Sequence, residues 1–140
     1  MTMVLAVLSG LLEHRYRRHL AVLEAHGVRV AVEESPAWAV AWAEVCQPDL
    51  VVVARVMPGM AGLELASLLC DRDGPSAPIV ILPEPGDQCD PSVCTHDRAT
   101  GRNAIEFYPS NQIWIRIAEL CGLRRARAPA RSDDLADGTG

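Results

Sequence analysis

Short, nearly unbroken apolar runs recur along the chain, and they are the feature that most limits how its 140 residues can fold. Each run has the length of one β-strand. A strand that is covered on one face alternates apolar and polar residues, whereas a run without alternation is typical of a strand buried on both faces. The pattern therefore predicts a parallel sheet between two layers of helices. The runs are Met3–Leu8, Val28–Val32, Leu50–Val53, Pro78–Leu82 and Ala104–Tyr108.

Helical patterns separate these runs. In the first, Tyr16, Leu20 and Leu23 recur at helical spacing, and Gly27 is a stop signal. In the second, Ser35-Pro36 supplies an N-cap followed by proline at the first helical position. The expected helices cover Leu12–His26, residues 36–47, Leu63–Cys70 and Asn111–Leu123. The alternation predicts a flavodoxin-like (βα)5 three-layer sandwich with a five-stranded parallel sheet.

One segment departs from this alternation. Residues 83–103 are rich in Pro, Gly, Asp and Cys and show little helical period, so we expect the fourth helix to be degenerate or replaced by a loop. The expected single domain covers residues 1–123. Residues 124–140 contain almost no apolar side chains, which predicts a flexible tail.

Charge and composition exclude several classes of function. The net charge is −5 with both signs interspersed, which disfavours binding of nucleic acid or of a membrane surface. All 13 basic residues are arginine, so chemistry that requires a lysine is excluded. The apolar N-terminus lacks a basic leader and runs into charged residues, and we expect a cytoplasmic protein. The abundance of alanine and arginine is typical of a bacterial chain.

Residues 48–69, PDLVVVARVMPGMAGLELASLL, resemble the centre of a response-regulator receiver domain. In that family a strand ends in the phosphoaccepting aspartate, and a loop of the MPGMDG type leads into the third helix. Here Pro58, Gly59 and Gly62 keep the turn residues of that loop. Residues 26–50 and 76–82 resemble the flanking strands and helix, and the resemblance covers about residues 3–122.

A working receiver places two acids after the first strand, the aspartate after the third, a hydroxyl residue after the fourth and a lysine after the fifth. The acids hold Mg²⁺ and the lysine neutralises charge on the phosphoryl group. The nearby acids Glu13 and Glu84 lie beyond the strand ends. The positions that correspond to the phosphorylation pocket are degenerate in this chain: Ser9, Gly10, Ala54, Pro83, Tyr108 and Pro109.

The resemblance therefore implies a pseudo-receiver, an atypical response regulator of two-component signalling that is not an enzyme and needs no cofactor. We expect it to act by protein–protein interaction, with a partner in a signalling complex or as a homodimer. In the receiver family the usual partner surface combines the fifth strand with the last helix. Its residues here would be Ile105, Phe107, Tyr108 and Trp114, next to the irregular segment 83–103.

Other side chains have less specific interpretations. Trp38 and Trp42 share one helix face and are expected to pack on the sheet or to form a half-exposed partner surface. Arg55 follows Ala54 and would either bind an anion near the empty pocket or form a surface salt bridge. The histidines of the first helix are expected to be solvated.

The main alternative is a small metal, redox or ligand sensor. Cys89, Cys94 and His96 form a C-x4-C-x-H pattern that could present soft ligands to a metal or form a redox pair. This spacing is not one of the standard metal-binding motifs, and no second cluster completes four ligands. A flavodoxin-like cobalamin module is a weaker alternative, because the DxHxxG-type loop is absent after the first strand.

Overall fold

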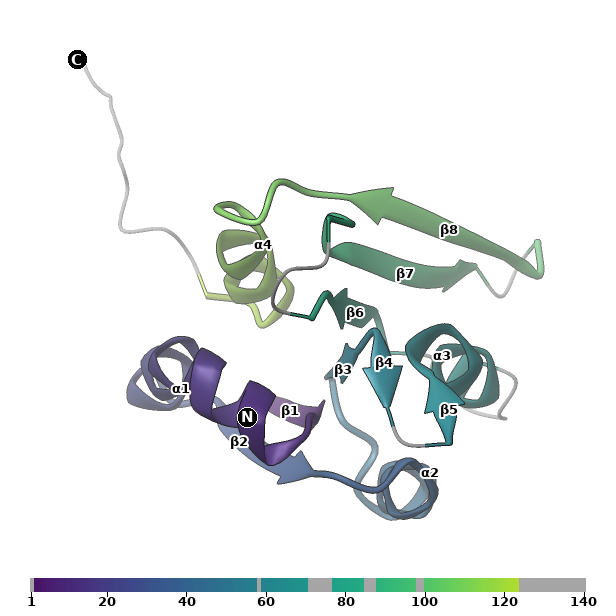
Figure 1. Cartoon of the computed structure of the whole chain (residues 1–140), viewed down its shortest axis with the longest axis horizontal. Coiled ribbons are helices and arrows are strands. Elements are labelled where there is room, and N and C mark those ends of the chain that lie inside the picture. The colour runs from purple at the N-terminus through teal and green to yellow at the C-terminus, as the bar shows by residue number, and fades with distance from the viewer. Residues whose placement is uncertain (1, 58, 71–76, 85–87, 98–99, 124–140) are drawn as a thin grey trace.

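A computed structural model describes residues 2–57, 59–70, 77–84, 88–97 and 100–123 (Figure 1). Among these residues the chain forms one six-stranded sheet, a two-stranded hairpin and four helices. The expected tail at residues 124–140 lies outside the described part.

The large sheet has the strand order β2-β1-β3-β6-β7-β8. Its first four strands are parallel, and β7 is antiparallel to both β6 and β8. Consequently β8 runs in the same direction as β6, although it is not adjacent to it. The strands are β1 (Met3–Val7), β2 (Arg29–Glu33), β3 (Leu50–Ala54), β6 (Ile79–Leu82), β7 (Ser92–Asp97) and β8 (Arg102–Phe107).

The helices cover the two faces of the sheet (Figure 1). The first and last helices lie together on one face, where Tyr16 contacts Trp114, and the second and third lie together on the other face. The predicted N-cap is confirmed, because the Oγ of Ser35 accepts from the Trp38 amide. A second cap was not predicted: the Oγ of Ser9 accepts from the Leu12 amide. The helices are α1 (Gly10–Ala25), α2 (Pro36–Cys46), α3 (Gly62–Cys70) and α4 (Ile113–Leu120).

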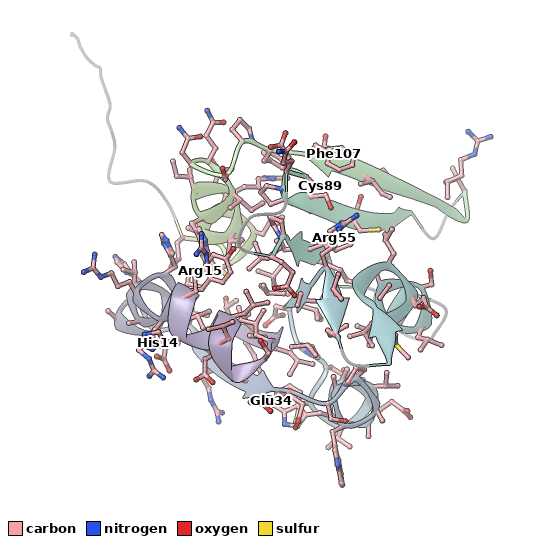
Figure 2. The ribbon with its side chains drawn as sticks, in the orientation of Figure 1. His14, Arg15, Glu34, Arg55, Cys89 and Phe107 are labelled. Atoms are coloured by element: carbon pink, nitrogen blue, oxygen red, sulfur yellow. The ribbon has the colours of Figure 1, made fainter. Side chains whose placement is uncertain are left out.

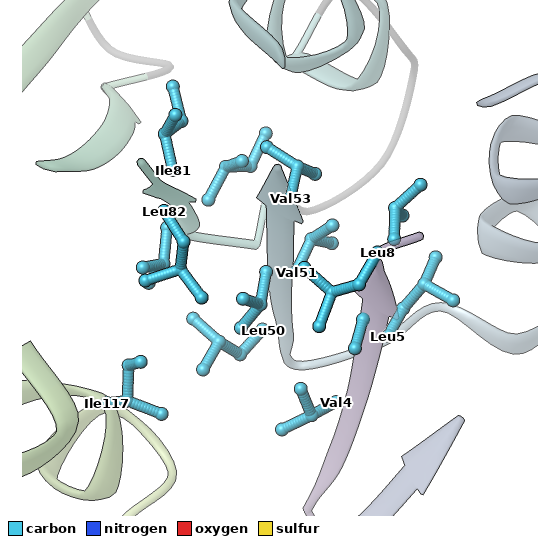
Figure 3. Close-up of a cluster of buried hydrophobic side chains, with 14 of the residues drawn as sticks. Val4, Leu5, Leu8, Leu50, Val51, Val53, Ile81, Leu82 and Ile117 are labelled. Atoms are coloured by element: carbon cyan, nitrogen blue, oxygen red, sulfur yellow. The ribbon is translucent and has the colours of Figure 1, made fainter. Parts of the chain in front are cut away.

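The core surrounds the central strands (Figure 3). Every residue of β3 and β6 is buried, as expected for strands that helices cover on both faces. Helix α1 contributes Leu12, Leu20 and Leu23, and α4 contributes Ile113 and Ile117. Helix α2 is different, because Ala39 is its only fully buried residue.

The flavodoxin-like α/β class is confirmed, but the sheet differs in detail from the predicted five parallel strands. Segment 83–103, expected to be a loop, contains β7, and no helix occurs in its described residues. In β7, Ser92, Val93 and Cys94 are buried between β6 and β8. The prolines and glycines on either side of this short run masked it in the sequence.

The VMPGMAG segment, which resembles the receiver loop before the third helix, forms a small antiparallel hairpin. Strand β4 (Val56–Met57) pairs with β5 (Met60–Ala61), and Gly59 adopts a φ of 78° at the tip. A positive φ of this size favours glycine. No helix in the described part of the chain is both long and apolar enough to cross a membrane.

Candidate functional site

Three of the pocket positions meet at one edge of the sheet. Parallel strands bring their carboxyl ends to the same edge, and this is where α/β sheets of this kind bind ligands. In the sheet register Val7 pairs with Val53, and Ala54 pairs with Leu82. The positions that follow β1, β3 and β6 therefore lie side by side, as the resemblance implies.

The position of the phosphoacceptor is closed and apolar. Ala54 is 1% exposed and ends β3. The chain folds back over it through β4 and β5, so that the Gly62 amide donates to the Arg55 carbonyl at 2.8 Å. A Cβ atom on Gly62 would collide with the carbonyl oxygen of Ala54. The end of β3 therefore offers a buried methyl group and packed backbone where a receiver has a reactive carboxylate.

The acidic-pair position carries no carboxylate of its own. Ser9 uses its hydroxyl to cap α1, and Gly10 begins that helix. One acid near this position was not predicted. Glu34 follows β2 (Figure 2), and its Oε2 atom would lie 3.3 Å from a Cβ atom built on Gly10. The sequence signal was the Glu33-Glu34 pair after the second apolar run. The Oε2 atom of Glu33 accepts the amides of Glu34 and Ser35.

These carboxylates do not assemble into a metal site. Within the described residues, no three His, Cys, Asp or Glu side chains lie close enough together to hold a metal ion. The carboxylate of Glu13 lies 3.8 Å from the Arg17 guanidinium, on the surface of α1. Glu84 is half-buried just beyond β6.

Pro83 stands where a receiver has a hydroxyl residue, and its backbone carbonyl makes a contact there. Pro83 follows β6, and its carbonyl accepts from the Tyr16 hydroxyl at 3.4 Å. This bond connects the end of β6 to α1. Proline supplies no side-chain donor for a phosphate oxygen.

The lysine position is displaced as well as substituted. Strand β7 lies between β6 and β8, so Tyr108 and Pro109 stand one strand farther from β6 than in a sheet where the last two strands are adjacent. With neighbouring strands about 4.8 Å apart, β8 lies roughly 10 Å from β6. The Tyr108 hydroxyl donates to Oε1 of Glu106 at 2.9 Å and accepts from Nε of Arg116 at 3.1 Å. Tyr108 is thus held towards α4 and away from the strand ends.

The four residues expected at the partner surface lie on two different faces. Side chains alternate along a strand, so Ile105 and Phe107 point away from Glu106, which is on the α4 side with Tyr108. Ile105 is 46% exposed and Phe107 is 67% exposed (Figure 2). We call the side of β7 and β8 that carries Ile105 and Phe107 the open face. In the described part of the chain, no helix packs extensively on β8.

Trp114 is half-buried between the two helices on the other face. Its ring stacks on His19 with centroids 4.6 Å apart and planes 6° apart, and it lies 5.6 Å from the Tyr16 ring. Burial, followed by the charge of Arg18, lowers the pKa of His19 below its ordinary value. A shallow cavity of about 380 Å³ beside this stack is lined by His19, Trp114 and Leu123, among others. His19 is exposed, as expected, but its ring also stacks on Trp114, which the sequence did not predict.

Helix α2 presents the other exposed aromatic side chain of note. Trp38 is 68% exposed, and Val45 is also strongly exposed on the same helix. Trp42, one turn beyond Trp38, is partly buried against the core. Trp42 thus packs on the core, and Trp38 lies on an exposed surface.

The cysteine and histidine pattern lies partly in strand β7 rather than in a loop. Cys94 is buried in β7 opposite Ile79 and Ile105, and burial raises its pKa. Cys89 is exposed and precedes the strand. The backbone of His96 belongs to β7, and its side chain lies outside the described part. A buried thiol with a raised pKa is a poor thiolate, which disfavours redox and metal chemistry at Cys94.

Comparison with known proteins shows a similarity of fold. No protein-family model and no curated protein sequence matches the chain. Among solved structures, the pseudo-receiver domain of the CikA protein, determined by NMR, matches with a TM-score of 0.50 and 17% sequence identity. The match covers 86% of this chain and 96% of that one. The chain therefore has the fold of a pseudo-receiver domain.

Proposed function

We propose that this chain is a phosphorylation-independent signalling adaptor of the receiver type, which acts by binding other proteins. The observation that carries the proposal is the buried methyl group of Ala54 at the position of the phosphoacceptor. A methyl group cannot accept a phosphoryl group. The chain also has no lysine to neutralise a phosphate at the sheet edge.

The electrostatics of the pocket support a domain that rests in one state. A working receiver stores repulsion between neighbouring carboxylates, and the metal and phosphate change that balance. Here the strand ends carry a capping serine, a glycine, a buried alanine and a proline. Without such repulsion, phosphorylation has no stored energy to release, and the signal depends on which partner is bound. The setting expected from the sequence is the bacterial cytoplasm.

Exposed apolar side chains support two candidate surfaces for a protein partner. Large aromatic residues are frequent among the residues that dominate binding energy. Phe107 and Ile105 on the open face fit this role, and Tyr108 and Trp114 form the opposite side of the same region. The Trp38 surface of α2 is the second candidate. We place the main contact on the open face, because there β8 exposes two large apolar side chains next to each other.

The first test concerns phosphorylation. The purified chain is incubated with acetyl phosphate and Mg²⁺, and its intact mass is measured. The proposal expects no change in mass. Addition of one phosphoryl group to the chain would overturn it.

The second test concerns the partner. Affinity capture from the source organism compares the wild-type chain with Phe107→Ala and with Leu11→Ala, a matched change at an exposed apolar residue of α1. We expect a co-purifying protein to be depleted roughly tenfold or more by the Phe107 change, since hot-spot truncation costs about 2 kcal/mol. The Leu11 variant should retain it. A partner set that is the same for all three chains would refute the open face as the contact, and Trp38→Ala would then test α2.

A further inference from the structure

Strand β8 leaves one side of its backbone open. Among the described residues it is the last strand of the sheet, and β7 is its one neighbour there (Figure 1). The Tyr108 amide donates to the Pro91 carbonyl at 3.0 Å, which fixes the alternation of hydrogen bonds along this antiparallel pair. By that alternation Glu106 and Ala104 bond to β7, while the N–H and C=O groups of Ile105 and Phe107 point to the free edge. An exposed edge of this kind is a template for another strand.

The side chains of β8 leave the same edge accessible. Ile105 and Phe107 are exposed on the open face, and the described residues of segment 83–103 form no helix that could cover them. Natural sheets commonly protect an edge with a covering element, a proline or a bulge. From Arg102 to Phe107 the strand contains no proline and pairs in continuous register with β7.

The charges of β8 select the partner. Arg102 and Glu106 are exposed, stand four residues apart and therefore lie on the same face of the strand. If a second β8 is antiparallel and the two-fold axis passes at Ala104, Arg102 of each copy lies directly opposite Glu106 of the other. This register also brings together backbone groups that both point outward. A parallel arrangement in register would instead oppose each charge with its own kind.

We propose that β8 pairs antiparallel with β8 of a second copy of this chain, about a two-fold axis at Ala104, to form one continuous sheet. The interface is isologous, as is usual for homodimers. The backbone hydrogen bonds hold the strands together, and the two Arg102–Glu106 pairs set direction and register. This self-association does not depend on the adaptor function proposed above, since it uses the strand edge and leaves the open face accessible.

The opposite edge of the sheet is less suited to the same contact. Strand β2 also begins with an arginine and ends with a glutamate, Arg29 and Glu33. The Glu33 carboxylate accepts the amides of Glu34 and Ser35, and the Glu106 carboxylate accepts the Tyr108 hydroxyl, so these bonds do not distinguish the two edges. Helices α1 and α2 both contact β2, whereas no helix in the described part of the chain packs extensively on β8.

Charge exchange tests the proposal. The mass in solution is measured by sedimentation velocity for the wild type, for Arg102→Glu, for Glu106→Arg and for the double exchange. We expect a dimer for the wild type and a dimer about tenfold or more weaker for each single variant, because each puts like charges opposite each other twice. The double exchange restores dimerisation. Arg17→Glu, an equal change of charge on the exposed surface of α1, leaves it intact.

Mixing the two single variants gives the sharpest outcome. One chain then carries two acidic side chains on β8 and the other carries two basic ones, so an antiparallel heterodimer forms where neither variant dimerises alone. A wild-type chain that stays monomeric at its highest soluble concentration would overturn the proposal. A dimer that resists both single changes, or that the double exchange does not restore, would overturn it equally.

Discussion

Gly62 is the residue at which β3 and the start of α3 approach most closely. Its amide donates to the Arg55 carbonyl, and a methyl group in place of its α-hydrogen would strike the Ala54 carbonyl oxygen. Because that atom belongs to the backbone of a buried strand, it cannot move aside as a flexible side chain can. The close turn over the empty acceptor position therefore depends on this glycine.

We expect Gly62→Ala to lower the free energy of unfolding by about 1–3 kcal/mol, the usual cost of overpacking. Urea denaturation measures the change. Gly10→Ala is the matched control, because its added methyl group meets only the carboxylate of Glu34, at the end of a flexible side chain. The control should stay within about 0.5 kcal/mol of the wild type. Equal losses in the two variants would contradict the steric explanation.

His19 gives a second prediction at the residue scale. Partial desolvation beside Trp114, followed by the charge of Arg18, holds the pKa of the exposed His19 ring below the ordinary value of 6.5. As the pH falls below 6.5, the unfolded chain takes up this proton before the folded one does. The contribution to stability is therefore complete above pH 6.5 and is lost as the pH falls towards the folded-state pKa.

Denaturation midpoints measured across this pH range test the effect. His19→Gln should weaken the decline in stability, and His14→Gln, a change at an exposed histidine of the same helix, should preserve it. A titration of the His19 ring by NMR with a midpoint above 6.5 would contradict the prediction.

At the scale of elements, α4 attaches to the sheet through one row of side chains. Ile113 and Ile117 are buried in the core, whereas Ile115 lies on the outer side of the helix. The Arg116–Tyr108 hydrogen bond adds a polar link to the end of β8. Burial of the isoleucines is the larger of these contributions, because a polar link at the surface competes with water.

We expect Ile117→Ala to cost about 2–5 kcal/mol of stability, as large-to-small changes in a packed core do. Ile115→Ala is the same chemical change on the exposed side of the helix and should cost less than about 1 kcal/mol. Chemical denaturation of both variants provides the comparison. Similar losses for the two would mean that α4 does not bury the face described here.

At the scale of the whole molecule, the insertion of β7 separates groups that a receiver keeps together. The positions after β1, β3 and β6 still share one edge, but the end of β8 is one strand farther away. Restoring one catalytic residue therefore does not restore the pocket, because the remaining groups are absent or displaced.

We accordingly expect Ala54→Asp to remain unphosphorylated by acetyl phosphate and Mg²⁺, as measured by intact mass. We also expect it to lose roughly 3 kcal/mol or more of stability, since it places an unpaired carboxylate at a buried site. Thermal denaturation reports the loss. A stable variant that gains a phosphoryl group would show that the site retains more of the receiver arrangement than its residues indicate.

The sequence predicted the parallel core well, because that part of the fold follows from local patterns. The unbroken apolar runs identified β1, β3 and β6, and the Ser35 cap with Pro36 placed the start of α2. The resemblance to receiver domains identified the pocket positions that follow these strands. By contrast, β7 was missed, because Cys94 and its neighbours are flanked by turn residues and depend on pairing with β6 and β8.

What the sequence by itself determined is which residue types stand at the pocket positions: an alanine and a proline among them, in a chain without lysine. Only the tertiary structure decided which side chains share a surface. It placed Ile105 and Phe107 opposite Tyr108, stacked His19 on Trp114 and left the edge of β8 open. The physical reason is that residue types are local properties, whereas faces and edges arise from contacts between segments far apart in the chain.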